Sequence, residues 1–132
     1  MISHLNKVAS TSEYASINGV NSFPLNEWIH SDTSEHMERL VYCQPLILIA
    51  QLATYLKYKS SLQGINIGGS LGHSQGNLAA TVCALSEEHF MENAKIACTY
   101  QFFQSITSER YVKTNLSGVT PMLSIQNLTY QE

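Results

Sequence analysis

The chain has 132 residues, of which 44% are hydrophobic and only 13% are charged. This length corresponds to about one domain, on a scale of roughly 150 residues per domain, so a mechanism spread over two domains must use another chain. Ten acidic and seven basic residues give a net charge of -3, which is too little positive charge to attract a nucleic-acid backbone. The low charged fraction favours extensive burial or protein contact.

The cysteines and the apolar stretches indicate the cellular compartment of the protein. Cys43, Cys83 and Cys98 are odd in number and show no C-x-x-C spacing, so we expect neither a disulfide framework nor a metal site. The first residues lack the apolar run of a secretory signal. The longest apolar stretch, residues 45–50, is far shorter than the ~18 residues of a membrane helix. These features predict a cytoplasmic protein without membrane contact.

The first half of the chain predicts helices. Residues 1–20 are rich in Ser, Asn and Thr and are expected to be a loosely ordered N-terminal segment. Apolar spacing predicts a short helix over residues 25–29 and a second helix through residues 37–41. Pro45 lacks an N–H, so we expect it to start a new helix that ends near Lys57. That helix is apolar almost all round, which predicts burial on more than one side.

The second half of the chain predicts a strand, a tight turn and two helices. Residues 64–71 contain a short apolar run that leads into a glycine-dense turn, and residues 77–85 have helical character. A longer helix is expected over residues 86–111. Residues 122–125 alternate like a strand. A chain that ends soon after a new strand begins is expected to be truncated.

The motif in this turn is G-x-S-x-G, formed by Gly72, His73, Ser74, Gln75 and Gly76. In a nucleophile elbow, such glycines let a strand turn sharply into a helix and present the serine hydroxyl. The backbone N–H of Gln75 then points to where an oxyanion would develop. The alternative is a serine in a glycine-rich turn that only shapes the backbone.

A serine nucleophile needs a general base, which is usually histidine. His73 is adjacent to Ser74, and adjacent side chains on a tight elbow generally diverge. His89, near the start of the following helix, fits a solvated histidine better. The only aspartate, Asp32, precedes the elbow, so the Ser, Asp, His order of the α/β-hydrolases is not completed here.

Five ordered blocks resemble the acetyltransferase domain of the fungal-type fatty acid synthase beta subunit. The starter-unit acyltransferase domains of fungal polyketide synthases look similar. The resemblance covers residues 23–132. The blocks are FPLNEW (23–28), QPLILIAQLATY (44–55), GHSQG (72–76), FF (102–103) and PMLSIQNLT (121–129).

The resemblance implies an α/β, malonyl-transferase-like fold. This is an α/β-hydrolase-like core with a short parallel sheet and an inserted ferredoxin-like subdomain. Residues 21–132 would be the N-terminal part of such an acyltransferase domain, truncated near residues 122–125, where the ferredoxin-like insert would begin.

The resemblance also implies the chemistry. Ser74 would take an acyl group from coenzyme A as an ester and pass it to the phosphopantetheine thiol of acyl carrier protein, with no permanently bound cofactor. The partners would be acyl carrier protein, acyl-CoA and the remaining domains of a fatty acid synthase complex. The family's base lies well downstream of the elbow, and its upstream glycine-rich oxyanion loop is not visible in residues 1–20.

Three further positions have two interpretations. Gln44 and Gln51 could face the acyl pocket, as the glutamine-proline block does in the family, or could be satisfied core amides. Family members tend to carry an arginine soon after the Phe-Phe pair. Here Thr107 falls near that point, and Arg110 could be either a substrate ligand or a solvated arginine at a helix end.

Other functions stay open. A serine esterase or lipase also uses G-x-S-x-G but should carry an aspartate and a histidine after the serine. A polyketide starter-unit acyltransferase would differ in acyl length. An inactive structural remnant of the acyltransferase would need no base at all.

Overall fold

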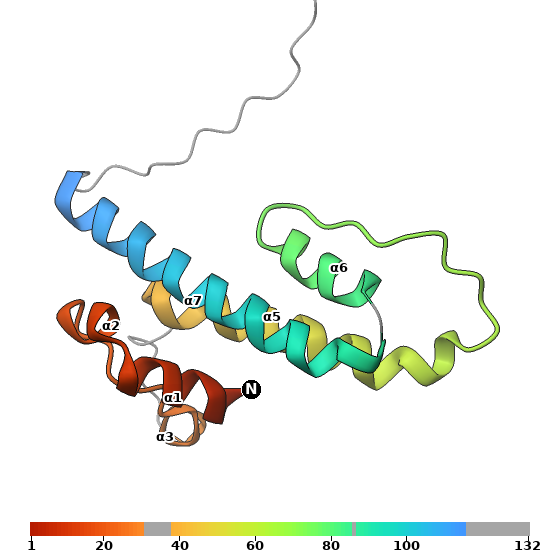
Figure 1. Ribbon diagram of the computed structural model, residues 1–132, viewed down its shortest axis with the longest axis horizontal. Helices are drawn as coiled ribbons and strands as arrows, with labels where there is room; N and C mark the ends of the chain where they lie inside the picture. Colours follow the sequence, from red (N-terminus) through yellow and green to blue (C-terminus); the bar gives the residue numbers. More distant parts are fainter. Residues whose placement is uncertain (31–37, 86, 116–132) are drawn as a thin grey trace, which may run out of the picture.

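The computed structural model describes residues 1–30, 38–85 and 87–115, and these residues form helices, turns and loops without any strand (Figure 1). Two long helices, α5 (Leu40–Tyr58) and α7 (Phe90–Asn115), form the framework. Arg39, just before α5, forms an ion pair with Glu109 near the end of α7. At the other end Tyr55 stacks on Phe90, with 5.8 Å between the ring centroids. The two helices are therefore antiparallel.

A shorter helix, α6 (Gly76–Ala84), packs against both α5 and α7. Its buried residues are Ala79 and Val82, spaced three apart, as expected for one face of a helix. Two 3-10 turns, η1 (Lys59–Leu62) and η2 (Glu87–His89), follow α5 and precede α7. The helices predicted after the turn are thus confirmed, with α7 beginning a few residues later than expected.

The N-terminal segment, which we expected to be loosely ordered, contains α1 (Ile2–Thr11) and α2 (Glu13–Ile17). Leu5 and Ala9, four residues apart, are buried where α1 packs on α7. Ser12 caps α2 by accepting a 3.1 Å hydrogen bond from the Ala15 N–H. The polar composition predicts a loosely ordered segment. Two apolar positions at helical spacing are nevertheless enough to hold α1 in place, because α7 covers them.

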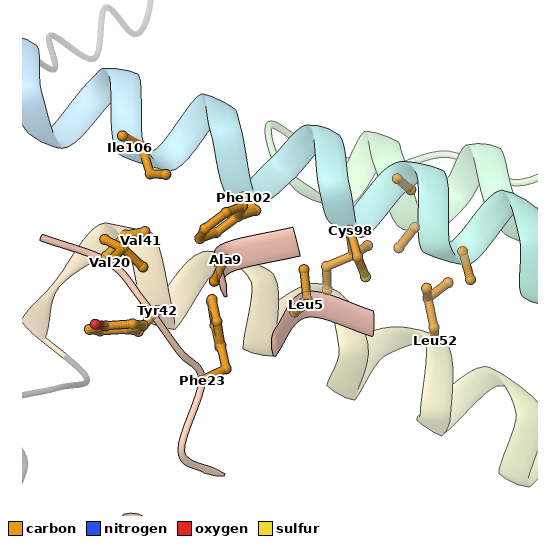
Figure 2. Close-up of a cluster of buried hydrophobic side chains, with 14 of the residues drawn as sticks. Leu5, Ala9, Val20, Phe23, Val41, Tyr42, Leu52, Cys98, Phe102 and Ile106 are labelled. Atoms are coloured by element: carbon orange, nitrogen blue, oxygen red, sulfur yellow. The ribbon is translucent and has the colours of Figure 1, made fainter. Parts of the chain in front are cut away.

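The core is centred on Phe23, which is fully buried (Figure 2). Its ring lies edge-on to Tyr42 and Phe102, with centroid distances of 5.2 and 5.5 Å. Asn6 of α1 makes two hydrogen bonds with the backbone of Phe23, at 2.7 and 3.1 Å. The predicted short helix follows as α3 (Leu25–Ile29). The aromatic cluster thus joins the N-terminal helices to α5 and α7.

The predicted α/β fold, an α/β-hydrolase-like core with a short parallel sheet, is wrong for the described residues, which form no sheet. The predicted strand within residues 64–71 is an irregular segment in which Ile65 and Ile67 are 59% and 54% exposed. A strand requires a neighbouring strand to satisfy its backbone groups, and none of the described segments supplies one. The second predicted strand, residues 122–125, and the start of the ferredoxin-like insert lie outside the described residues.

The predicted helix start at Pro45 is also wrong, because α5 begins at Leu40 and continues through the proline. Proline inside a helix costs about 3 kcal/mol, since it removes a hydrogen bond and crowds the preceding turn. Val41 and Tyr42 before Pro45 are buried, as are Leu48 and Leu52 after it. Burying apolar side chains on both sides of the proline outweighs this cost.

Candidate active site

The chain turns sharply just before α6, and Ser74 lies in this turn. Its φ is +52°, and it is the only non-glycine residue with positive φ in the described parts of the chain. The Gly76 N–H donates to the His73 carbonyl at 2.9 Å, and the Asn77 N–H donates to the Ser74 carbonyl at 3.1 Å. Residues with side chains rarely adopt this conformation, which costs on the order of 1–3 kcal/mol and is concentrated at functional sites.

Gly72 makes this turn possible. A Cβ atom on Gly72 would overlap the backbone carbonyl group of Gly76, whereas a Cβ atom on Gly76 would meet nothing within 4 Å. The glycine two residues before the serine is therefore required by a close backbone approach. The glycine two residues after the serine is not required by its own surroundings.

The backbone N–H of Gln75 is available for an oxyanion. The next two N–H groups, of Gly76 and Asn77, are bonded within the turn. The Gln75 N–H has no hydrogen-bond acceptor in the described residues. It lies at the N-terminus of the nine-residue helix α6, where the partial positive charge of the helix end favours an anion. The predicted oxyanion role of Gln75 is compatible with this geometry and stays a prediction.

Ser74 borders a hollow of about 370 Å³ that has no charged side chain in its described wall. Five of the lining residues carry side-chain amides, and the others are a leucine, a tyrosine and the serine itself. They are Gln44, Gln75, Asn77, Gln101, Gln104, Leu78, Tyr100 and Ser74. The site is thus neutral and rich in hydrogen-bonding groups.

A buried polar cluster joins the wall of this hollow to the helix pair. Gln44 Oε1 accepts a 2.7 Å hydrogen bond from Gln101 Nε2 and lies 2.9 Å from Ser105 Oγ. Gln101 and Ser105 are 2% and 0% exposed. Neither residue is among those predicted from the sequence, although both continue the buried series of Ala97 and Cys98 at helical spacing. Polar residues at core positions of a helix were the available signal.

The two predicted pocket glutamines lie in different places. Gln44 is half-buried and lines the hollow at Ser74, so it is both a wall residue and a bonded amide of the cluster. Gln51 is exposed and lines a second hollow of about 400 Å³ together with His73 and Gly72. Only Gln44 is therefore placed beside the serine.

No histidine of the described ranges lines the hollow at Ser74. His73 borders the second hollow, which agrees with divergent side chains at the turn. His89 Nδ1 lies 3.7 Å from Glu92 Oε2 on the surface, and His4 Nε2 bonds Thr99 Oγ1 at 2.8 Å. Asp32 lies outside the described residues. The described part of the site thus lacks a general base.

Arg110 lies elsewhere. It lines a third hollow, of about 300 Å³, together with Arg39, Glu109 and Lys113. Glu109 accepts hydrogen bonds from Arg39 Nε at 3.0 Å and from Lys113 Nζ at 2.7 Å. The structure does not bring Arg110 together with Ser74, and Thr107 instead lies 3.2 Å from the Tyr14 hydroxyl.

The cysteines do not offer an alternative nucleophile. Burial raises the pKa of all three thiols, and it raises the pKa of Cys98 to about 11. A thiol with a raised pKa carries little of the reactive thiolate at neutral pH. In the residues that the structure describes, no group of three His, Cys, Asp or Glu side chains could hold a metal ion.

One helix is long and apolar enough to cross a membrane by length and composition alone, α5 extended by η1 over Leu40–Leu62. We had expected none, because we judged the chain by its longest uninterrupted apolar stretch. The core helix of a globular helical protein passes the same test, and this helix packs against α6 and α7, although only 28% of its apolar window is buried. The described residues form a small helical bundle in which α7 contacts α1, α5 and α6.

Comparison with protein-family models, with curated proteins and with solved structures gives no match to this chain.

Proposed function

We propose that this chain is part of a cytoplasmic acyl-transferring enzyme of fatty acid synthesis. It would move an acetyl or other short acyl group from coenzyme A to the phosphopantetheine thiol of acyl carrier protein, through an ester on Ser74. The observation that carries the proposal is the positive φ of Ser74, at a turn that requires glycine at position 72. Strained backbone at an exposed serine before a helix is one feature of a nucleophile elbow, and the strand that precedes the serine in such an elbow is absent from the described residues.

The reaction has two steps. In the first, Ser74 Oγ attacks the thioester carbonyl carbon, the C–S bond breaks, and the serine proton leaves with the coenzyme A thiol by way of a base. In the second, the carrier thiol attacks the ester carbonyl, the C–O bond breaks, and a proton returns to Ser74 Oγ. Both steps form an oxyanion that the Gln75 N–H can stabilise, and one such donor contributes about 2.7–4 kcal/mol.

The general base must come from outside the described residues, because no histidine in them lines the hollow. A positioned base contributes roughly 10²–10⁴-fold to the rate. If no residue outside the described ranges supplies this base, the 132-residue chain should be acylated slowly, and added protein that supplies a base should accelerate acylation.

The test is mass spectrometry of the intact chain after incubation with isotopically labelled acetyl-CoA. We expect one acetyl group per chain, mapped by peptide analysis to Ser74 and absent in Ser74→Ala. Ser70→Ala is the matched control, because Ser70 lines the second hollow and should keep the label. A label on a cysteine, or one that persists in Ser74→Ala, would refute the proposal.

A non-catalytic structural role is the second candidate. It is favoured by the absence of a histidine from the described wall of the Ser74 hollow. It predicts that Ser74 reacts with neither acetyl-CoA nor a serine-directed fluorophosphonate. Reaction with the fluorophosphonate at Ser74, but not in Ser74→Ala, would exclude this role.

A further inference from the structure

Gln101 has a buried carbonyl oxygen without a partner. The residue is 2% exposed, and its Oε1 has no hydrogen-bond partner in the part of the chain that the structure describes. Leaving a buried polar atom unpaired costs about 1–3 kcal/mol, so nearly all such atoms in folded proteins are satisfied. An unpaired oxygen on a residue that lines a hollow therefore points to a bound hydrogen-bond donor.

The hydrogen bonds around Gln101 determine what the ligand must provide. Its Nε2 donates to Gln44 Oε1 at 2.7 Å and lies 3.5 Å from Ser105 Oγ. The Ser105 hydroxyl donates to the Gln101 backbone carbonyl at 2.6 Å. Both amide hydrogens thus have acceptors, and only the carbonyl oxygen is left. The ligand must supply a donor, an N–H or an O–H.

The composition of the hollow favours a neutral ligand. None of its described lining residues is charged, and Gln44, Gln75, Asn77 and Gln104 add further amide groups around Gln101. A charged group would leave water here without an opposite charge to compensate for its lost hydration. A chain of secondary amides is neutral and pairs with side-chain amides through both its N–H and its C=O.

Access to Gln101 requires a movement of its neighbours, because its Oε1 has almost no exposed surface. Tyr100 and Gln104 share the wall and are exposed. Neither makes a hydrogen bond through its side chain to another described residue. Their side chains are therefore held by no described hydrogen bond when a ligand enters the hollow.

We propose that Gln101 is a specificity-determining residue of the Ser74 hollow, and that its Oε1 accepts a hydrogen bond from a secondary amide N–H on the thiol arm of the acyl donor. This inference rests on the proposed function, which places a thioester in the same hollow. The site then distinguishes thioesters whose sulfur is joined to an amide from thioesters of simple thiols.

The experiment compares two unreactive probes that differ in one group. S-methyl-N-acetylcysteamine carries an amide N–H, and 2-(methylthio)ethyl acetate carries an ester oxygen in its place. Each is titrated into the isotopically labelled 132-residue chain, and binding is followed by the NMR shifts of the side-chain amides. We expect the amide probe to bind roughly threefold to tenfold more tightly, as for one neutral hydrogen bond, and to shift the Gln101 side-chain amide.

Two variants assign the preference. Gln101→Met removes the acceptor at similar length and should bind both probes equally. Gln51→Met changes an exposed glutamine that lines a different hollow and should keep the preference. Equal binding of the probes to the unmodified chain, no binding of the amide probe, or a preference that persists in Gln101→Met would overturn the inference.

The probes also separate the inference from the proposed function. If Gln101→Met fails to fold, the inference is tested by the relative binding of the two probes to the unmodified chain. An amide preference without acetylation of Ser74 would support the binding role of Gln101 and refute acyl transfer. Acetylation of Ser74 without a preference for the amide probe would support acyl transfer and refute the binding role of Gln101.

Discussion

Gln75 Nε2 donates a 2.7 Å hydrogen bond to the backbone carbonyl of Gln44, and this contact holds the turn at Ser74 on α5. Gln44 is bonded in turn to Gln101 of α7 through its side chain. The strained turn is therefore connected to both long helices. Its geometry depends on their packing as well as on its own glycines.

Gly72→Ala should disrupt the turn. The added methyl group would overlap the Gly76 carbonyl group, so the chain must open and the Gln75–Gln44 hydrogen bond should be lost. We expect a loss of about 1–3 kcal/mol of stability in denaturant unfolding. Gly68→Ala is the control, because a Cβ there meets nothing within 4 Å. Equal stability of the two variants, with an unchanged Gln75 side-chain resonance, would contradict this expectation.

Ser74→Gly should relieve strain. Glycine adopts positive φ readily, whereas an L-residue in the left-handed region pays roughly 1–2 kcal/mol. Glycine also increases the entropy of the unfolded chain, so we expect a net gain of about 0.5 kcal/mol. Ser74→Ala retains the strained φ and serves as the comparison in thermal or denaturant unfolding. A glycine variant less stable than the alanine variant would show that the backbone at residue 74 is unstrained.

Glu109 should make the stability of the fold depend on pH. Burial opposes ionisation of Glu109, but hydrogen bonds from Lys113 and Arg39 outweigh it and hold the pKa of the carboxyl below its ordinary value of 4.5. Because the folded pKa is the lower one, this stabilisation is fully present above pH 4.5 and is lost as the pH falls through the folded value. Glu109→Gln should therefore cost about 1.5–3 kcal/mol at neutral pH.

The difference between this variant and the unmodified chain should shrink as the pH is lowered below 4.5, as measured by denaturant unfolding across pH. Glu92→Gln is the control, because Glu92 is exposed and pairs only loosely with His89 at 3.7 Å. Its effect should stay within about 0.5 kcal/mol, as for surface residues. A Glu109→Gln cost that is independent of pH would argue against an ionic contribution.

The exposed apolar residues before the turn should bind a hydrophobic dye. Ile65, Ile67 and Leu71 are 59%, 54% and 94% exposed and lie close together in the sequence, so we expect them to offer a dye more apolar surface than one exposed side chain does. Changing all three to Thr should lower dye binding while changing stability by less than about 1 kcal/mol. Undiminished dye binding would place the apolar surface elsewhere.

For comparison, Leu48→Ala should cost about 2–5 kcal/mol, because Leu48 is fully buried in α5. The sequence predicts that this helix is buried on more than one side. Leu48 and Leu52 are buried there, while Ile47 and Leu56 are 44% and 45% exposed. Exposed apolar side chains thus lie on α5, on the segment before the turn and on α7, where Ile96 and Tyr100 are 62% and 58% exposed.

The local features of the site were predictable. Gly72 and Ser74 identified a sharp turn, and helical spacing after Gly76 identified α6. Both depend on residues adjacent in sequence, because a glycine's freedom and a helix's periodicity are local properties. The neighbour of the turn was not predictable, because the contact from Gln75 to Gln44 joins residues 31 positions apart.

By itself, the sequence determined α3, α6, α7 and the turn at Ser74, since these depend on spacing and backbone sterics within a few residues. Only the tertiary structure decided that residues 64–71 form no strand, that α5 runs through Pro45, and that Gln101 lies beside Ser74 in one hollow. A strand exists only when a distant segment supplies its hydrogen bonds. A proline or a glutamine is tolerated inside a helix only when distant residues pack around it or bond it, and such partners cannot be identified from local pattern.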